Sequence, residues 1–162
     1  MLKGHTFPIC EVAFSPNGRS LVSASDDRSV RIWSVRDGSS NVLPVIGSPN
    51  SFMSAAFSPD GRYVVAGNWD SSLWIWDSRT HRLVAMWRDH TNGVLCTVFT
   101  ADGKGLMSGD SDNTVKHWDV SSLGHRQGAS TGMVVNNEQG FPEVRSFLGH
   151  SVRCVYSLIP RY

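Results

Sequence analysis

The chain has 162 residues, of which 40% are hydrophobic, and this is the size and composition of an ordinary single domain. A formal net charge of +1 gives no sign of nucleic acid or a membrane as a direct partner, and no apolar run approaches the roughly 18 residues that a membrane-spanning helix needs. The three cysteines have no CxxC spacing, which favours reduced thiols over a disulfide or a metal site.

Short segments of alternating apolar and polar residues, separated by turns, predict an all-β protein. Asn17-Gly18 and Asp26-Asp27 mark the first two turns, and no segment has a convincing 3.6-residue apolar period. Four short strands in each period predict four-stranded antiparallel sheets. In chain order the expected strands are 9–15, 21–25, 30–34 and 41–46, then 53–57, 63–67, 73–77 and 83–88, then 94–99, 105–109, 114–118 and 144–148, and a last one at 152–158.

One stretch of sequence recurs three times. It is LVSASDDRSVRIW at its first occurrence, VVAGNWDSSLWIW at its second and LMSGDSDNTVKHW at its third. Each copy ends in a Trp and carries an Asp six residues before it: Trp33 with Asp27, Trp76 with Asp70, and Trp118 with Asp112. The steps between the tryptophans are 43 and 42 residues, which predicts three copies of one structural unit.

A histidine stands at a fixed place in two of these units, since His5 and His90 each lie 28 residues before the Trp. Gly149-His150 opens a further copy. A period of about 40–45 residues with an upstream Gly-His and a Trp-Asp ending is the WD40 signature. The chain therefore resembles the WD40 β-propeller family over nearly all of its length. The resemblance implies a partial propeller of three four-stranded antiparallel blades plus one strand of a fourth, with repeats at 4–46, 47–88 and 89–148, a loop insertion at 121–142, and the start of a fourth repeat at 149–162.

The resemblance also implies internal hydrogen-bonded tetrads: His5, Ser23, Asp27 and Trp33 in the first repeat, and His90, Ser108, Asp112 and Trp118 in the third. The chemistry fits, because an indole only donates, a carboxylate only accepts, and hydroxyl and imidazole groups do both. The second repeat keeps Asp70 and Trp76 but has Ser48 and Ala66 in place of the His and Ser. We expect that blade to be held more by packing, with help from Trp69 and Trp74.

Ser, His and Asp are also the members of a hydrolase triad. This set repeats along the chain, whereas an active site usually occurs once, and no G-x-S-x-G elbow is present. We therefore predict no catalytic residue and keep a Ser-His-Asp hydrolase as a remote alternative. Residues 110–113 resemble the start of a calcium loop but lack its later Gly and Glu, and no phosphate-binding Gly loop or HExxH occurs. No metal or cofactor is expected.

In the WD40 family, partners dock on the narrow face of the ring. The resemblance places the binding positions beside the turn Asp of each repeat and early in each innermost strand. Those beside the turn are Asp26, Arg28, Trp69, Ser71, Ser111 and Asn113. Those in the strands are Pro8, Cys10, Ser51, Met53, Gly93 and Leu95. Trp69, beside Met53, is the favoured contact, because aromatic anchors carry much of the energy of protein–protein binding.

Within the family, LVSASDDRSVRIWSVRDG and FTADGKGLMSGDSDNTVKHWDV look like the propeller of fungal Tup-type (Groucho-like) corepressors. That likeness implies binding to DNA-bound repressors in the nucleus, without direct nucleic-acid contact. A scaffold or adaptor of another complex, in ubiquitin ligation or signalling, is the alternative. His5, Pro8 and Glu11 interrupt the apolar run that a signal peptide would need, so a nuclear or cytoplasmic location is expected.

Three blades of a ring leave two blade faces without a neighbour. Val30 and Ile32 in the first blade, and Val94 and Val98 in the third, are expected to belong partly to those faces. Uncovered apolar surface and unpaired strand edges promote association. We therefore expect self-association, aggregation or low expression of the 162-residue chain.

Overall fold

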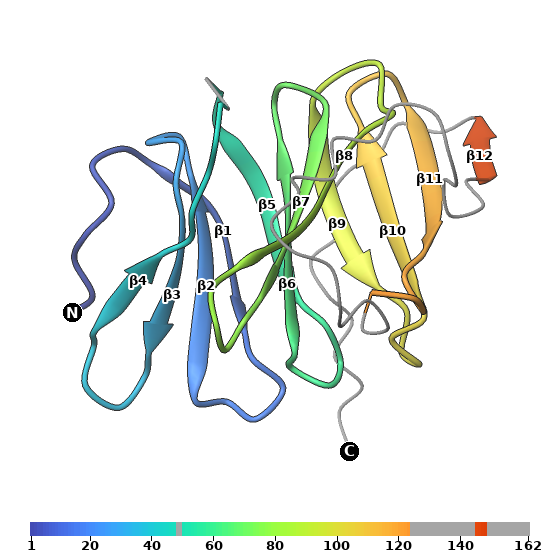
Figure 1. Cartoon of the computed structure of the whole chain (residues 1–162). Helices are drawn as coiled ribbons and strands as arrows, with labels where there is room; N and C mark the ends of the chain where they lie inside the picture. The colour runs from blue at the N-terminus through green and yellow to red at the C-terminus, as the bar shows by residue number, and fades with distance from the viewer. Residues whose placement is uncertain (48–49, 124–144, 149–162) are drawn as a thin grey trace.

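The computed structural model describes residues 1–47, 50–123 and 145–148. These residues form twelve strands in three four-stranded antiparallel sheets (Figure 1), which confirms the all-β prediction and is consistent with a partial propeller. No helix in the described ranges could cross a membrane. The sheets are β1 (Ile9–Phe14), β2 (Ser20–Ser25), β3 (Val30–Ser34) and β4 (Ser40–Val42); β5 (Phe52–Phe57), β6 (Tyr63–Asn68), β7 (Ser72–Asp77) and β8 (Leu83–Arg88); and β9 (Val94–Phe99), β10 (Gly105–Asp110), β11 (Thr114–Asp119) and β12 (Arg145–Leu148).

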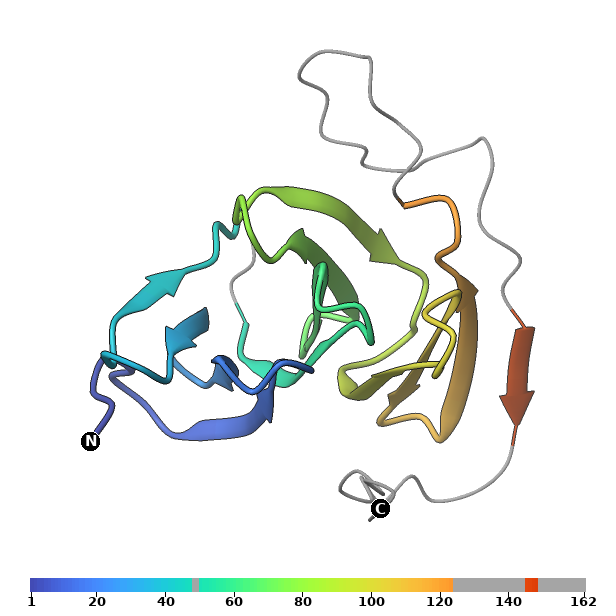
Figure 2. The same ribbon diagram turned by 90° about the horizontal axis from the view of Figure 1, so that it is seen from below.

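Each sheet is one blade, and its strands are hydrogen-bonded in chain order. The first strands of the blades, β1, β5 and β9, lie next to one another and form the inner wall. Seen from below, the blades form sectors of an arc, with the first and third at its ends (Figure 2). The expected strand at 152–158 and nearly all of the expected insertion at 121–142 lie outside the described residues.

The same short turn joins the first two strands of every blade. The Ser15 carbonyl accepts the N–H of Gly18, and the pairs Ser58–Gly61 and Thr100–Gly103 repeat this bond at 2.8–2.9 Å. All three glycines have φ between +67° and +72°, where a side chain would be strained. The recurring Gly of the sequence therefore marks a backbone requirement.

Strand β4 ends at Val42, four residues before its expected end. Leu43 leaves the edge of the sheet, although its N–H still donates to the Val30 carbonyl at 2.8 Å, and its side chain is 1% exposed among the residues between the first two blades. Pro44 follows and has no N–H to extend the ladder. The apolar run at 41–46 is thus only partly a strand, and its Leu43 fills space in the core between the first two blades.

Two apolar cores hold the blades together. The first lies between blades one and two and contains Trp74 and Trp76, whose rings stack at 5.9 Å between centroids. The second lies between blades two and three, where Trp87 stacks on Trp118 at 5.1 Å with an interplanar angle of 7°. Each core excludes water from the inward faces of two neighbouring sheets, so burial of large aromatic surfaces sets the blade geometry.

The expected exposure of four apolar residues was wrong for three of them. Val30 and Ile32 are buried in the first core, and Val94 in the second. Only Val98 is open, with 58% of its surface exposed. For Val30 and Ile32 the alternation of a strand explains the error, because each sheet has two faces and the sequence does not show which one meets the neighbouring blade. Val94 and Val98 would share a face in a regular strand, but the register shift in the pairing of β9 with β10 puts them on different faces.

Candidate functional site

A closed hydrogen-bonded chain crosses the first blade. The Trp33 indole N–H donates to Ser23 Oγ at 2.7 Å, and that oxygen lies 2.6 Å from His5 Nε2. His5 Nδ1 in turn lies 2.7 Å from Asp27 Oδ2. The side chains of His5 and Asp27 are only 3% and 6% exposed. Every polar group is satisfied, so the network fixes the segment before β1 against the turn between β2 and β3.

The third blade has the same chain with a different carboxylate. Trp118 donates to Ser108 Oγ at 2.7 Å, and His90 Nε2 lies 2.6 Å from that oxygen. His90 Nδ1 meets Asp110 Oδ2 at 2.7 Å, where we had expected Asp112. That assignment of Asp112 is therefore corrected to Asp110.

The physical reason for this exchange is position along β10. Asp110 ends the strand at an irregularity in its pairing with β9, and its side chain is fully buried. Its carboxylate accepts Thr114 Oγ1–H at 2.6 Å. Asp112 is exposed and accepts bonds from Thr91 and Asn92 instead. The buried carboxylate, that of Asp110, is therefore the one that forms the hydrogen bond with His90.

The second blade replaces the tetrad with another polar chain. The Trp74 indole donates to Ser72 Oγ at 2.7 Å, and Ser72 donates to Asp70. Asp70 also pairs with Arg88 at 3.0 Å. Trp76, the tetrad tryptophan by sequence, donates to the Pro44 carbonyl at 2.8 Å.

The expectation that packing holds the second blade is confirmed, because its strands contribute buried residues to both apolar cores, with Trp74 in the first. The second blade also has this polar network, and sequence reasoning missed its members Ser72 and Arg88. Trp69 is 47% exposed, and its ring packs on Gly93 of the third blade and belongs to neither apolar core. Ser48 lies outside the described residues. A Ser two residues after the Asp, present also as Ser29 beside Asp27, was the available sequence signal.

The tetrads have the contacts of a hydrolase triad but not its access. Ser23 and Ser108 are each 1% exposed, and both oxygens are occupied by an indole N–H. A nucleophile must reach its substrate, so these hydroxyls serve the fold. Among the described residues, no group of three or more His, Cys, Asp or Glu side chains could hold a metal ion.

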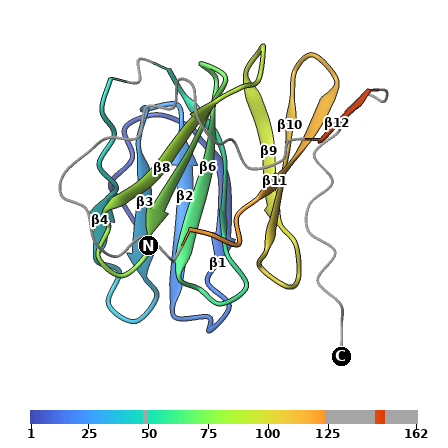
Figure 3. The ribbon, with the colours of Figure 1, turned by 45° about the vertical axis from the view of Figure 1, so that its right-hand side comes forward.

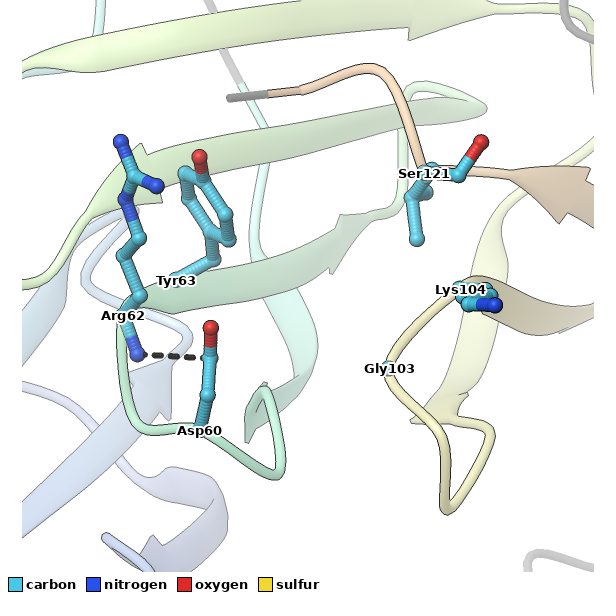
Figure 4. Close-up of a pocket in the computed structure, with 7 residues that line it drawn as sticks. Asp60, Arg62, Tyr63, Gly103, Lys104 and Ser121 are labelled. Atoms are coloured by element: carbon cyan, nitrogen blue, oxygen red, sulfur yellow. Dashed lines mark hydrogen bonds between the residues drawn. The ribbon is translucent and has the colours of Figure 1, made fainter. Parts of the chain in front are cut away.

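A small polar pocket of about 250 Å³ lies between the lower turns of the second and third blades (Figure 4). It is lined by Asp60, Arg62, Tyr63, Gly103, Lys104, Val120 and Ser121. Asp60 Oδ1 accepts the backbone N–H of Arg62 at 2.9 Å and so closes its own turn. The pocket includes no tetrad residue, which gives the buried Ser-His pairs no adjoining substrate site there.

Acid should weaken the fold in two steps. Burial lowers the pKa of His90 despite its bond to Asp110, so its neutral form stabilises the fold above pH 6.5 and this is lost as pH falls from there towards the folded-state pKa. Burial raises the pKa of Asp27, but bonds from Ser29 and His5 outweigh it and lower the pKa to about 2. That stabilisation is lost between pH 3.8 and about 2. Urea unfolding at fixed pH values measures both steps, and greater stability at pH 5 than at pH 7 would contradict the first.

The turns β2–β3, β6–β7 and β10–β11 and the starts of β1, β5 and β9, where the predicted partner-binding positions lie, are at one rim of the sheets, the upper end in Figures 1 and 3. In each blade the residue before the turn Asp donates its backbone N–H to the segment that leads into the inner strand, at 2.9–3.0 Å. The pairs are Asp26 with Pro8, Trp69 with Ser51, and Ser111 with Gly93. The structure thus brings together the two sets of positions that the sequence analysis singled out.

The rim turns share one backbone but carry different side chains. Arg28, Ser71 and Asn113 all have left-handed φ angles, at 68°, 67° and 63°. Asp26, Arg28 and Asn113 are exposed, whereas Ser71 and Ser111 are half-buried, as are Met53 and Leu95 in their strands. Chemical variety on a fixed frame is a suitable basis for selecting partners.

Trp69 is the prominent feature of this rim. It belongs to the second blade, yet its ring lies over Gly93 of the third, where an added Cβ would meet ring carbons at 3.0 Å. Nearly half of the side chain remains open to solvent. A large aromatic ring that is held in place but accessible is the usual form of a binding anchor.

Comparison with known families identifies the family of this chain. The family described as "WD domain, G-beta repeat" matches residues 1–34, 41–77 and 81–119. The chain belongs to the WD40 family. Propellers of this family are typically non-catalytic scaffolds that bind other proteins.

Solved WD40 structures share the fold. The WD40 repeats of RRP9 superpose with a TM-score of 0.76 at 24% identity, covering 92% of this chain and 41% of that one. U3-55K superposes with a TM-score of 0.75 at 25% identity, covering 92% of this chain and 42% of that one. The chain thus spans less than half the length of either structure.

Curated relatives match shorter parts. WD repeat-containing protein SL1-17 of Schistosoma mansoni is 54% identical over 37 residues, which are 23% of this chain and 12% of the relative. Ribosome assembly protein 4 of Saccharomyces cerevisiae is 51% identical over 37 residues, 23% of this chain and 7% of the relative. The WD40 repeat-containing protein HOS15 of Arabidopsis thaliana is 46% identical over 39 residues, 24% of this chain and 6% of the relative.

Proposed function

We propose that the chain is a non-catalytic protein–protein interaction scaffold that binds its partner at the rim built from the turns β2–β3, β6–β7 and β10–β11. The observation that carries the proposal is the half-exposed Trp69 held across two blades. Around it stand Asp26, Arg28, Ser71, Ser111 and Asn113, with Met53 and Leu95 behind them. Neither direct nucleic-acid binding nor a membrane partner belongs to this proposal.

Two settings are proposed for this scaffold. A fragment of a nuclear transcriptional corepressor follows from the likeness of its repeats to Tup-type propellers. A scaffold in ribosome assembly is favoured by a different observation, the match to a relative that carries that name. Adaptors in ubiquitin ligation or signalling remain the alternative of the sequence analysis. The location is nuclear or cytoplasmic in every case.

Replacing Trp69 by alanine is expected to weaken partner binding about 30-fold, because loss of a buried aromatic anchor costs about 2 kcal/mol or more. Affinity capture with quantitative mass spectrometry compares the wild type with Trp69→Ala. The matched control is Val35→Ala. Val35 is also 47% exposed, but it lies in the first blade near the β1–β2 turn, at the end of the sheets opposite the rim. Partners that are lost with Trp69→Ala and retained with Val35→Ala support the rim, and their identities separate corepressor from ribosome-assembly complexes. Equal retention in both variants would exclude the rim as the binding face.

A further inference from the structure

Two asparagines of this chain are each followed by a glycine, at Asn17-Gly18 and Asn92-Gly93. Asparagine is a chemically labile residue, and a following glycine increases the lability because no Cβ shields the backbone nitrogen beside the side-chain amide. Both asparagines are exposed to solvent. The folded chain nevertheless holds the two pairs in different geometries, and the difference decides which amide can react.

Loss of the amide starts when the backbone nitrogen of the following residue gives its proton to a base and attacks the side-chain carbonyl carbon. A bond forms between this nitrogen and Cγ, the bond between Cγ and Nδ2 breaks, and ammonia leaves with a proton from solvent. Water then opens the succinimide ring that has formed. Opening at Cγ gives aspartate, whereas opening at the main-chain carbonyl gives isoaspartate, whose backbone is longer by one methylene group.

The side chain of Asn92 lies against the nitrogen that would attack it. The Gly93 N–H donates to Asn92 Oδ1 at 2.8 Å, so this nitrogen is already beside the amide group. Asn92 Nδ2 donates to Asp112 Oδ1 at 3.0 Å, which holds the amide in this rotamer. Groups that the fold keeps next to each other react faster than groups that must first be brought together.

The side chain of Asn17 is held away from its glycine. The Gly18 N–H donates to the Ser15 carbonyl at 2.8 Å, across the turn between β1 and β2. Asn17 Oδ1 accepts the Ser15 hydroxyl at 2.8 Å and the Arg19 N–H at 3.0 Å. The nitrogen of Gly18 therefore reaches the amide carbon only after the turn has opened and these bonds have broken.

We propose that Asn92 is a deamidation site of the folded chain, and that its conversion to aspartate or isoaspartate disturbs the rim around Trp69. The consequence for partner binding rests on the proposed function, whereas the chemistry at Asn92 does not. A carboxylate at position 92 faces that of Asp112, where the amide now donates a hydrogen bond, and the two like charges repel. An isoaspartate also lengthens the backbone directly before Gly93, on which the Trp69 ring packs.

Deamidation of Asn17 has no such consequence. Asp60 and Asp102 occupy its position in the other two blades, and each closes the same turn with the same two hydrogen bonds. An aspartate at position 17 therefore fits the turn, and it adds its charge at the end of the sheets opposite the rim. Asn17→Asp is thus the matched control for Asn92→Asp.

The first experiment measures both rates in the full chain, folded at mildly alkaline pH and unfolded in urea. Trypsin places Asn17 in the peptide 4–19 and Asn92 in the peptide 89–104, so mass spectrometry follows each site separately. In the folded chain, Asn92 is expected to deamidate about 10-fold faster than Asn17 or more. In urea neither geometry survives, and the two rates should converge. Equal rates in the folded chain, or a faster reaction at Asn17, would overturn the proposal.

The second experiment examines the rim without a partner, by fluorine NMR of the chain labelled with fluorotryptophan. Trp69→Phe identifies the Trp69 signal by its loss. Asn92→Asp is expected to shift this signal, whereas Asn17→Asp should leave it in place. A Trp69 signal that Asn92→Asp does not move would refute the effect on the rim.

Affinity capture then connects this change to binding. Partners that are lost with Trp69→Ala should also be reduced by Asn92→Asp and retained with Asn17→Asp. Full retention with Asn92→Asp would refute its effect on binding and leave the proposed function intact. If Trp69→Ala loses no partner, the rim is refuted as the binding face, while the two deamidation rates and the Trp69 signal still decide the inference about Asn92.

Discussion

Replacing Asp110 by alanine is expected to destabilise the folded chain by about 3 kcal/mol, whereas Asp112→Ala should cost less than about 1 kcal/mol. The Asp110 carboxylate is fully buried and accepts bonds from His90, from the Thr114 hydroxyl and from the backbone N–H groups of Thr114 and Asp112. Its loss leaves several buried donors without an acceptor. The exposed Asp112 carboxylate bonds only Thr91 and Asn92, and water can replace it.

Urea denaturation at one low protein concentration measures both variants, so that association contributes equally to each. Asp110→Asn is the informative control, because it keeps the shape and an acceptor oxygen but removes the charge. It should fall between the wild type and Asp110→Ala. A larger loss for Asp112→Ala than for Asp110→Ala would show that the spacing rule of the sequence, and not the buried geometry, identifies the tetrad carboxylate.

The fold was accessible from sequence because one period carries three kinds of physical information. The Gly after each first strand marks a left-handed turn, the Trp marks a buried strand, and the spacing shows that the units are copies. The end of β4 was not accessible. Val42, Leu43 and Pro44 form one apolar run, and only the packing of Leu43 between blades shows where the ladder stops.

The tetrad of the first repeat could likewise be predicted from sequence, whereas that of the third could not. The first tetrad could be assigned by counting back from Trp33, because the first repeat has Ser25 at the position of Asp110, and Asp27 binds the histidine. In the third repeat, Asp110 and Asp112 are two residues apart, and counting from Trp118 selects the exposed one. The same irregular pairing occurs at the corresponding position of every blade, where Ser25 and Asn68 are also buried, and the third repeat places a carboxylate there.

The second blade shows why substitution of a motif residue does not predict loss of its function. Without the tetrad Ser and His, Trp76 donates to the Pro44 carbonyl, and Trp74 takes a new partner in Ser72. Each buried indole N–H still finds an acceptor, as desolvation requires. The sequence showed the missing groups, but the replacements come from backbone and neighbouring side chains that only three dimensions bring close.

The largest loss of stability is expected for Trp118→Ala, at about 3–5 kcal/mol. Trp118 is fully buried in the second core, stacks on Trp87 and donates to Ser108 Oγ. Alanine removes a ring that packs between the second and third blades. It leaves a cavity that the surrounding sheets cannot close, because their hydrogen bonds fix them. Trp118→Phe keeps an aromatic ring in the stack and loses mainly the donated bond, so it should cost about 1–2 kcal/mol.

Trp33→Ala distinguishes the contribution of the tetrad hydrogen bond from that of interblade packing. Urea denaturation at low protein concentration measures the free energy of unfolding of Trp118→Ala, Trp118→Phe and Trp33→Ala. Trp33 donates to Ser23 as Trp118 donates to Ser108, and it is buried at 4% exposure, but it lies outside both interblade cores. Its removal should therefore cost less than the removal of Trp118. Equal losses for the two alanine variants would mean that the hydrogen-bonded chain, and not the packing of one blade on the next, supplies most of the stability at these positions.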